Sequence, residues 1–181
     1  MKNRKGFTLV EAVAAIATVT LLTAIGYGKY QKFMAANELR QTATNVYLEL
    51  RNLHQIARQY DAKVFVKFTT NSCTIYADTN DNGSIDANEL LKTITAPSSV
   101  TFAVAADGPT TKPSEINSIS DMTGNWGAQI TVNNDAVSTT NDGAVYMSSK
   151  RMSVTTYCIG QASPMLTVKE YKWEGSKWSN L

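Results

Sequence analysis

Twelve residues, from Asp78 to Glu89, carry the side chains that a calcium ion prefers. The segment reads DTNDNGSIDANE, with a glycine at position six and an apolar residue at position eight. Calcium-binding loops use this spacing, because a hard cation needs several oxygens and the glycine permits the turn that gathers them. We expect no obligatory cofactor, and calcium is the ion that this pattern favours. The predicted ligands are Asp78, Asn80, Asn82, the Ser84 backbone carbonyl, Asp86 and Glu89.

A hairpin turn in water is the alternative reading of the same segment. Asp, Asn and Gly are also the residues that turns need. The flanks of the segment alternate like strands, whereas the best-known calcium loops lie between two helices. Both readings stay open on the sequence alone.

The two cysteines and the one histidine exclude most other chemistry. Cys73 and Cys158 have neither zinc-ligand nor Cys-x-x-Cys spacing. In an oxidising compartment a disulfide between them is reasonable, and two buried thiols on separate strands are the alternative. His54 lies beside an apolar helical stripe, where a packing or surface role is expected. The sequence has no phosphate-binding glycine loop and no nucleophile elbow, so we expect no enzyme.

An apolar run from Phe7 to Ile25 follows a short basic leader, residues 1–6. As a helix the run is roughly 28 Å long, close to the ~30 Å of a hydrocarbon core. The leader's Lys and Arg favour a cytoplasmic amino terminus, so the rest of the chain lies across the membrane. Glu11 is the one charged residue in the run. A lipid-facing carboxylate costs at least ~2.5 kcal/mol, which argues that it has a partner or a task.

The segment Lys5-Gly6-Phe7-Thr-Leu-Val-Glu11 resembles the prepilin motif of type IV pilins and type II secretion pseudopilins. The resemblance implies that a prepilin peptidase cuts between Gly6 and Phe7 and that Phe7 is N-methylated. It also implies that Glu11 pairs with the amino terminus of a neighbouring subunit during assembly, which neutralises both charges in an apolar bundle. A plain, uncleaved single-pass anchor is the alternative.

The resemblance is strongest to the minor pseudopilin H branch and related minor pilins. Beyond the prepilin motif it rests on Tyr76–Gly83 and, more weakly, on Asn141-Asp-Gly143. It implies a pilin fold whose head is periplasmic and whose helix lies in the inner membrane before assembly into a filament. The implied partners are the prepilin peptidase, other pilin or pseudopilin subunits and an inner-membrane assembly platform. DNA-uptake members carry a Gly-Arg-x-Arg-type motif near the carboxyl end, and this chain lacks it.

A second helical pattern follows the apolar run. From Ala36 to Tyr60, apolar residues recur three and four apart, and no proline occurs before Pro97. One helix from Phe7 to Tyr60 would span about 80 Å. Gly26 and Gly28 mark either the membrane boundary or a point of bending. The expected organisation is a leader at 1–6, a transmembrane or filament-core helix at 7–28, an amphipathic helix at 29–60 and a β-rich head at 61–181.

The remainder alternates with the period of strands. An α+β fold is therefore expected, with the long helix packed on an antiparallel head. Glycine, proline, serine and threonine mark residues 107–126 as the longest loop. Strands are expected at 64–68, 73–77, 90–95, 100–105, 129–132, 144–147, 152–159 and 165–173, with a terminal hairpin through Glu174-Gly175.

Three functions follow from these patterns. The leading one is a structural minor subunit of a type IV pilus or type II secretion pseudopilus, and a major pilin is its close alternative. A pilus subunit that binds extracellular DNA is the third. The net charge of +2 and the nearby Glu170 and Glu174 argue against nucleic acid. Basic and aromatic residues, which could bind phosphates and stack on nucleobases, nevertheless alternate near the carboxyl end. They are Lys169, Tyr171, Lys172, Trp173, Lys177 and Trp178.

Overall fold

The computed structural model describes five stretches of the chain and gives the backbone alone for parts of three of them. Gly6, most of the predicted loop at 107–126 and the predicted turn at Asn141-Asp142 lie outside the described residues. The chain divides into two compact units, Met1–Met34 and Ala35–Leu181. The described residues are 7–104, 109, 129–133, 143–162 and 167–181, with backbone alone at 129–130, 143, 153–162 and 167.

Helix α1 comprises Leu9–Tyr60, which confirms the predicted long helix. The helix contains no proline, and Gly26 and Gly28 lie within it without interrupting the helical hydrogen bonding. Glycine in a helix costs ~1 kcal/mol relative to alanine, and a helix of this length absorbs that cost. The helix ends where Asp61 adopts a positive φ of 46°, a conformation that Asp tolerates better than most residues.

One antiparallel sheet of the second unit has the strand order β3-β2-β1-β5 among the described residues. Its central pair is joined by a short turn, and Phe65 lies opposite Tyr76 in the register. A single turn of 3-10 helix, η1, precedes β3 and was not predicted. The bounds are β1 Lys63–Phe68, β2 Ser72–Asp78, η1 Ala87–Glu89, β3 Leu90–Thr95 and β5 Gln129–Val132.

The other antiparallel sheet has the order β4-β6-β7-β8-β9. The strand predicted at 100–105 is shorter than expected and ends at Thr101. The Phe102 N–H donates to the Thr70 carbonyl in the β1–β2 turn, at 2.9 Å, which takes it out of the ladder with β6. The bounds are β4 Val100–Thr101, β6 Gly143–Ser149, β7 Met152–Ala162, β8 Thr167–Trp173 and β9 Trp178–Asn180.

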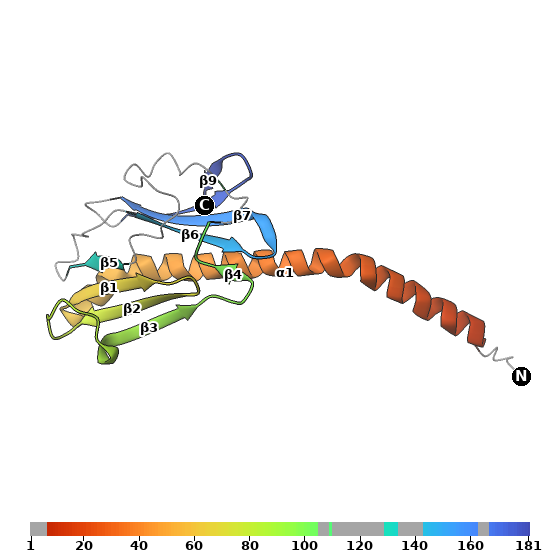
Figure 1. Cartoon of the computed structure of the whole chain (residues 1–181), viewed down its shortest axis with the longest axis horizontal. Coiled ribbons are helices and arrows are strands. Elements are labelled where there is room, and N and C mark those ends of the chain that lie inside the picture. Colours follow the sequence, from red (N-terminus) through yellow and green to blue (C-terminus); the bar gives the residue numbers. More distant parts are fainter. Residues whose placement is uncertain (1–6, 105–108, 110–128, 134–142, 163–166) are drawn as a thin grey trace, which may run out of the picture. The chain divides into compact units, whose positions relative to one another are not determined.

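The hydrophobic core of the second unit lies where both sheets meet the helical residues from Ala35 onward (Figure 1). Leu39, Leu50 and Leu53 are almost completely buried there. Full burial of such side chains stabilises a fold by about 1.5–3 kcal/mol each. The α+β class is therefore confirmed, and its helix is held by a common core with strands β1, β2, β5, β6 and β8.

Candidate functional site

The first turn of α1 is closed by Thr8 and Glu11. The Glu11 N–H donates to Thr8 Oγ1 at 3.3 Å, while Glu11 Oε2 accepts the Thr8 N–H at 2.9 Å and the Thr8 hydroxyl at 2.8 Å. This reciprocal arrangement is a capping box, which satisfies backbone donors that a helix start leaves unpaired. It also holds the carboxylate at the amino-terminal end of the helix, where the helix dipole favours negative charge.

Phe7, one of the two predicted processing residues, lies at this same end. Phe7 is the first described residue and is 78% exposed, and Glu11 lies one helical turn further on. Gly6 lies outside the described residues, so the predicted scissile bond is not tested. The structure therefore gives the local environment of Glu11, and its pairing with a second subunit stays a prediction.

The apolar run of the first unit presents its side chains outward on all faces. Large apolar side chains from Leu9 to Ile25 are between 59% and 80% exposed. By length and composition, this part of α1 can cross a membrane. These side chains are Leu9, Val10, Val13, Ile16, Val19, Leu21, Leu22 and Ile25.

The hydroxyl groups in this run are satisfied inside the helix. The side chains of Thr18, Thr20 and Thr23 each donate to the carbonyl four residues earlier, at 2.8 Å. Lipid offers no hydrogen-bond partners, so a polar group in a spanning helix has to find one within the protein. Glu11 and Thr8 satisfy each other in the same way at the start of the helix.

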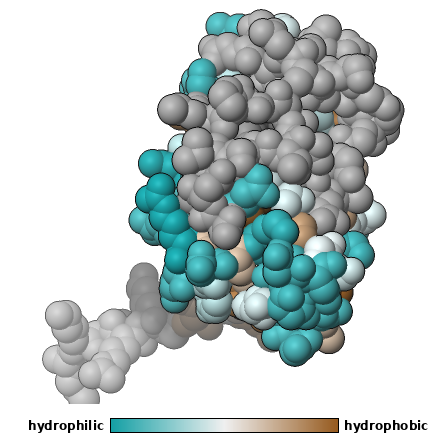
Figure 2. All heavy atoms as spheres, turned by 90° about the vertical axis from the view of Figure 1, so that its left-hand side faces the viewer, coloured by the Kyte–Doolittle hydropathy of each residue, from teal (hydrophilic) through white to brown (hydrophobic). Residues whose placement is uncertain are grey.

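The acidic loop connects β2 to β3 and is built around a buried carboxylate. Asp78 is 2% exposed and accepts hydrogen bonds from the backbone N–H groups of Asn82 and Gly83, both at 3.0 Å. Gly83 has a φ of +71° and Asp81 a φ of +51°, so the chain turns sharply here. Figure 2 views the end of the head that carries this loop, and hydrophilic side chains gather on it.

The other predicted ligands join the same hydrogen-bond network. The amides of Asn80 and Asn82 donate to Asp86 Oδ2 at 3.0 and 2.9 Å. Glu89 is 3% exposed, and its carboxylate accepts the N–H groups of Thr79 and Asp86 at 3.0 and 3.3 Å. The Asp86 and Glu89 contacts form a second capping box, around η1.

The loop thus gathers all six predicted residues, and Ser84 joins it through a 2.7 Å hydrogen bond from its N–H to Asn82 Oδ1. The Asp78 and Glu89 carboxylates accept backbone N–H groups, and the Asp86 carboxylate accepts the side-chain amides of Asn80 and Asn82. In the part of the chain that the structure describes, no three His, Cys, Asp or Glu side chains are grouped closely enough to hold a metal ion. The geometry by itself is that of a self-closed turn, and calcium binding stays a proposal.

Cys73 is a free, buried thiol in β2, 1% exposed. Burial, together with the nearby Glu49 carboxylate, raises the pKa of this thiol to about 12. Cys158 lies in β7, in the other sheet, and its side chain is outside the description. The structure forms no bond at Cys73, so the disulfide stays a prediction without structural support.

The aromatic residues near the carboxyl end pack against one another. Tyr171 is 3% exposed, and the Trp173 and Trp178 rings have centroids 5.3 Å apart. Tyr146 lies 6.1 Å from Trp178, measured between ring centroids. A base stacks only on an accessible ring, and packing already covers Tyr171. The arrangement therefore weakens the case for a stacking platform.

Two contacts that the sequence patterns did not reveal attach α1 to the head. Ser99 donates to the Glu38 carboxylate, and Lys92 in β3 forms a salt bridge with Glu49. Another acid, Glu170, lies in β8 and is 9% exposed. The spacing of residues along the helix carries no signal for which residue of the head each acid contacts.

No protein-family model matches the chain, and no curated protein matches it. Among solved structures, the chain is similar to the minor pseudopilin EpsH from the Type 2 Secretion System of Vibrio cholerae. The two sequences are 12% identical with a TM-score of 0.45, and the alignment covers 80% of this chain and 96% of that one.

Proposed function

We propose that this chain is a structural subunit, a minor pilin or pseudopilin, of a type IV pilus or a type II secretion pseudopilus. The observation that carries the proposal is Glu11, the one charged residue in the apolar run from Phe7 to Ile25, which is otherwise suited to a membrane. Glu11 lies four residues after Phe7, within the segment from Lys5 to Glu11 in which this chain resembles prepilins. A carboxylate in that place is costly unless assembly gives it a cationic partner.

Processing would supply the cationic partner. Cleavage between Gly6 and Phe7 creates an amino group one residue before Thr8, at the same helix end as Glu11. The amino group of one subunit and the carboxylate of the next then neutralise each other within the apolar bundle. The partners proposed for this pathway are a prepilin peptidase, other subunits of the filament and an inner-membrane assembly platform.

The proposed location follows from the same helix. Before assembly the apolar run spans the inner membrane once, with the basic leader in the cytoplasm and the head in the periplasm. After assembly the subunit lies in a periplasmic or surface filament. A non-enzymatic role follows from the proposal, because the contribution of such a subunit is its contacts with other subunits.

Mass spectrometry and incorporation assays test this function. After expression of the full chain with its cognate peptidase, the mature protein should begin at a methylated Phe7. A mature protein that still begins at Met1 would contradict the proposal. Glu11→Gln should abolish incorporation into filaments. Thr18→Val is the matched control, because the Thr18 hydroxyl bonds only within its own helix. Equal incorporation of the wild-type and Glu11→Gln chains would also contradict the proposal.

Two alternatives share this pathway and differ in what they predict. A major pilin would dominate sheared filaments, whereas a minor subunit would be a small fraction of them. A DNA-binding subunit would retard DNA in a salt-dependent manner, because phosphate contacts release counterions. The buried Tyr171 disfavours that second alternative.

We also propose that the acidic loop binds calcium. Supporting it are the twelve-position spacing and the hydrogen bonds that join Asn80, Asn82 and Glu89 to Asp86 in one loop. Calorimetric titration of the full chain in detergent micelles with calcium chloride should give heat in the wild type. Glu89→Gln should lose that heat, while Asp61→Asn, an exposed acid outside the loop, should keep it. A calcium concentration of about a millimolar reaches the Kd of the weakest known calcium-binding loops. If the wild type gives no heat there, the segment is a hairpin turn that does not bind calcium.

A further inference from the structure

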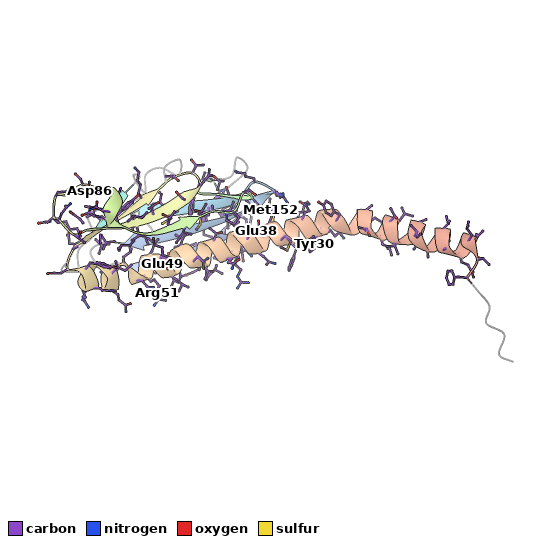
Figure 3. All side chains as sticks on the ribbon, turned by 90° about the horizontal axis from the view of Figure 1, so that it is seen from below. Tyr30, Glu38, Glu49, Arg51, Asp86 and Met152 are labelled. Atoms are coloured by element: carbon purple, nitrogen blue, oxygen red, sulfur yellow. The ribbon has the colours of Figure 1, made fainter. Side chains whose placement is uncertain are left out.

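A row of exposed aromatic side chains follows the apolar run of α1. Tyr27, Tyr30 and Phe33 recur three residues apart, so neighbours in the row lie on adjoining parts of the helix surface. They are 60%, 60% and 62% exposed. Figure 3 marks Tyr30, in a part of α1 whose side chains project outward. Between Phe7 and Tyr27 the chain has no aromatic residue, so the aromatic residues lie at the two ends of the apolar run.

Two lysines lie among these aromatic residues. Lys29 and Lys32 are both exposed, and they too are three residues apart. No acidic residue occurs between Glu11 and Glu38, so none lies within one helical turn of either lysine. In the part of the chain that the structure describes, neither of the two salt bridges involves them. The positive charge of this short segment is therefore not neutralised by carboxylates along the helix.

The position of the segment along α1 matches the border of a membrane. The helix begins at Leu9. At a rise of ~1.5 Å per residue, Tyr27 lies about 27 Å from that start and Lys32 about 35 Å from it. A hydrocarbon core is ~30 Å thick, and the headgroups extend the bilayer to about 40–45 Å. When the apolar run fills the core, the aromatic rings begin at its border and the lysines lie in the headgroup layer.

Both residue types suit that layer. A tyrosine ring is apolar while its hydroxyl is polar, so tyrosines gather at membrane–water interfaces. A lysine lays its aliphatic stem along apolar surface and extends its ammonium group toward water or a phosphate. Near a surface of anionic lipids each lysine adds to the attraction.

We propose that Tyr27, Lys29, Tyr30, Lys32 and Phe33 form an interfacial girdle whose two lysines bind the phosphates of anionic phospholipids. The lipids are those of the leaflet where the helix leaves the membrane. The inference rests on the proposed function only in that the apolar run spans a membrane. Removal of the leader would leave these lysines as the only basic residues between positions 7 and 39.

The charge of the girdle favours lipid over a second copy of the same segment. A second copy would bring two more lysines and no carboxylate, and like charges facing each other are repelled. Phospholipid phosphates supply the opposite charge at the depth where the lysines lie. The aromatic residues fix that depth, since their rings are stabilised at the border of the core.

Electron paramagnetic resonance of spin-labelled lipids tests the girdle. The full chain is reconstituted in phosphatidylcholine vesicles that contain a trace of nitroxide-labelled phosphatidylglycerol or phosphatidylcholine. Lipid that touches the helix moves slowly and gives its own spectral component. The ratio of this component between the two labelled lipids measures the preference for the anionic headgroup. The test variant combines Lys29→Gln with Lys32→Gln. The matched control combines Lys67→Gln with Lys177→Gln, which removes two exposed lysines of the head.

The wild type should prefer phosphatidylglycerol, by about fivefold at a lipid site beside one lysine. The test variant should lower this ratio, whereas the control should keep it. At about 1 M salt, where the Debye length is ~3 Å, the preference should weaken. Equal ratios in the wild type and the test variant overturn the inference, because the face would then contact neutral lipid or another helix.

The basic leader at the other end of the span needs its own control. Lys2→Gln, Arg4→Gln and Lys5→Gln together remove its three charges. In that background the chain should still prefer phosphatidylglycerol, and adding the two girdle substitutions should bring the ratio to about one. A preference that disappears with the leader charges alone also overturns the inference.

The lipid and incorporation results separate the two proposals. A slow component without any preference for phosphatidylglycerol means that the girdle is wrong. The subunit role then still stands if Glu11→Gln abolishes incorporation. No slow component with either labelled lipid means that the chain does not enter the bilayer, which overturns the girdle and the proposed membrane location together.

Discussion

The Thr8 hydroxyl donates a hydrogen bond to Glu11 Oε2 at 2.8 Å and accepts one from the Glu11 N–H at 3.3 Å. One side chain therefore binds both the carboxylate and the backbone of Glu11 in the first turn of the helix. Glu11 therefore has a partner within its own chain before it meets any neighbour. The prepilin resemblance explains this carboxylate by assembly, and the capping box adds a local reason for a carboxylate here. The two roles are compatible, because a carboxylate accepts several hydrogen bonds.

Loss of the Thr8 hydroxyl should loosen the start of α1. Thr8→Ala removes both side-chain contacts, and loss of an amino-terminal cap costs about 0.5–2 kcal/mol. Hydrogen exchange on the full chain in micelles should then show faster exchange of the amides of residues 9–12. Thr18→Ala, which removes a hydroxyl bonded in mid-helix, should leave those four amides unchanged. Equal protection in wild type and Thr8→Ala would argue against the capping box.

Two leucines on the same helix should differ sharply in what they contribute to the head. Leu50 is 1% exposed in the core, whereas Leu48 is 47% exposed. Leu50→Ala should lower the free energy of unfolding by about 2–5 kcal/mol, because it leaves a cavity. Leu48→Ala should change it by no more than about 0.5 kcal/mol. Urea unfolding followed by tryptophan fluorescence measures both, and similar losses would mean that the helix is packed differently.

Glu170 should make the head less stable as the pH rises. Burial raises the pKa of this carboxyl group, and the nearby Arg40 guanidinium offsets part of the rise. Between the unfolded-state pKa of about 4.3 and the raised native value, the folded chain holds a proton that the unfolded chain has released. The free energy of unfolding therefore falls as pH rises through this interval.

Removing the Glu170 charge should abolish that fall. Glu170→Gln is expected to be more stable than the wild type at about pH 7, with the difference vanishing below about pH 4. Urea unfolding measured across this range gives the comparison. Glu174→Gln is the control, because Glu174 is exposed in the β8–β9 turn. Parallel stability curves for wild type and Glu170→Gln would show that burial does not disfavour the charge.

Cys73 should be unreactive while the chain is folded. Its pKa of about 12 leaves far less thiolate than an ordinary cysteine with a pKa near 8.5, and the thiolate is the species that alkylates. Iodoacetamide at about pH 8 should therefore label Cys73 slowly in the native chain. In denaturant without reductant it should label quickly, since the thiol is free. If labelling requires a reductant, Cys73 is oxidised, as the predicted bond to Cys158 demands.

Residue pattern by itself determined the long helix and the strands of the head. The three- and four-residue apolar spacing from Ala36 to Tyr60 is a property of the chain, and burial of Leu39, Leu50 and Leu53 confirms it. The short β4 could not be read from the sequence. Val100 and Phe102 are equivalent positions in an alternating pattern. The Phe102 N–H, however, donates its hydrogen bond to the Thr70 carbonyl in the β1–β2 turn, and so the strand ends before it.

The acidic loop shows the same division at the level of a site. Its spacing predicted six ligands, and the side chains of five of them share one hydrogen-bond network. Ser84 joins that network through its N–H, whereas the prediction used its carbonyl. The direction in which each carboxylate points was decided in three dimensions. Asp78 and Glu89 became buried, and a buried carboxylate takes whichever donors are nearest, here backbone N–H groups.

Glu11 and Arg51 are both charged residues of α1, and they differ in how much of their environment the sequence predicts. The charge of Glu11 within an apolar run is evident from the sequence, because membrane cost depends on composition along one helix. That arginines are the exposed charged residues of α1 from Ala35 onward, Arg51 among them, is not evident, since Glu38 and Glu49 lie on the same helix. Only packing against Ser99 and Lys92 draws those acids inward. No periodicity in the sequence reveals partners from distant parts of the chain, so tertiary structure decided which charged residues of the helix are exposed.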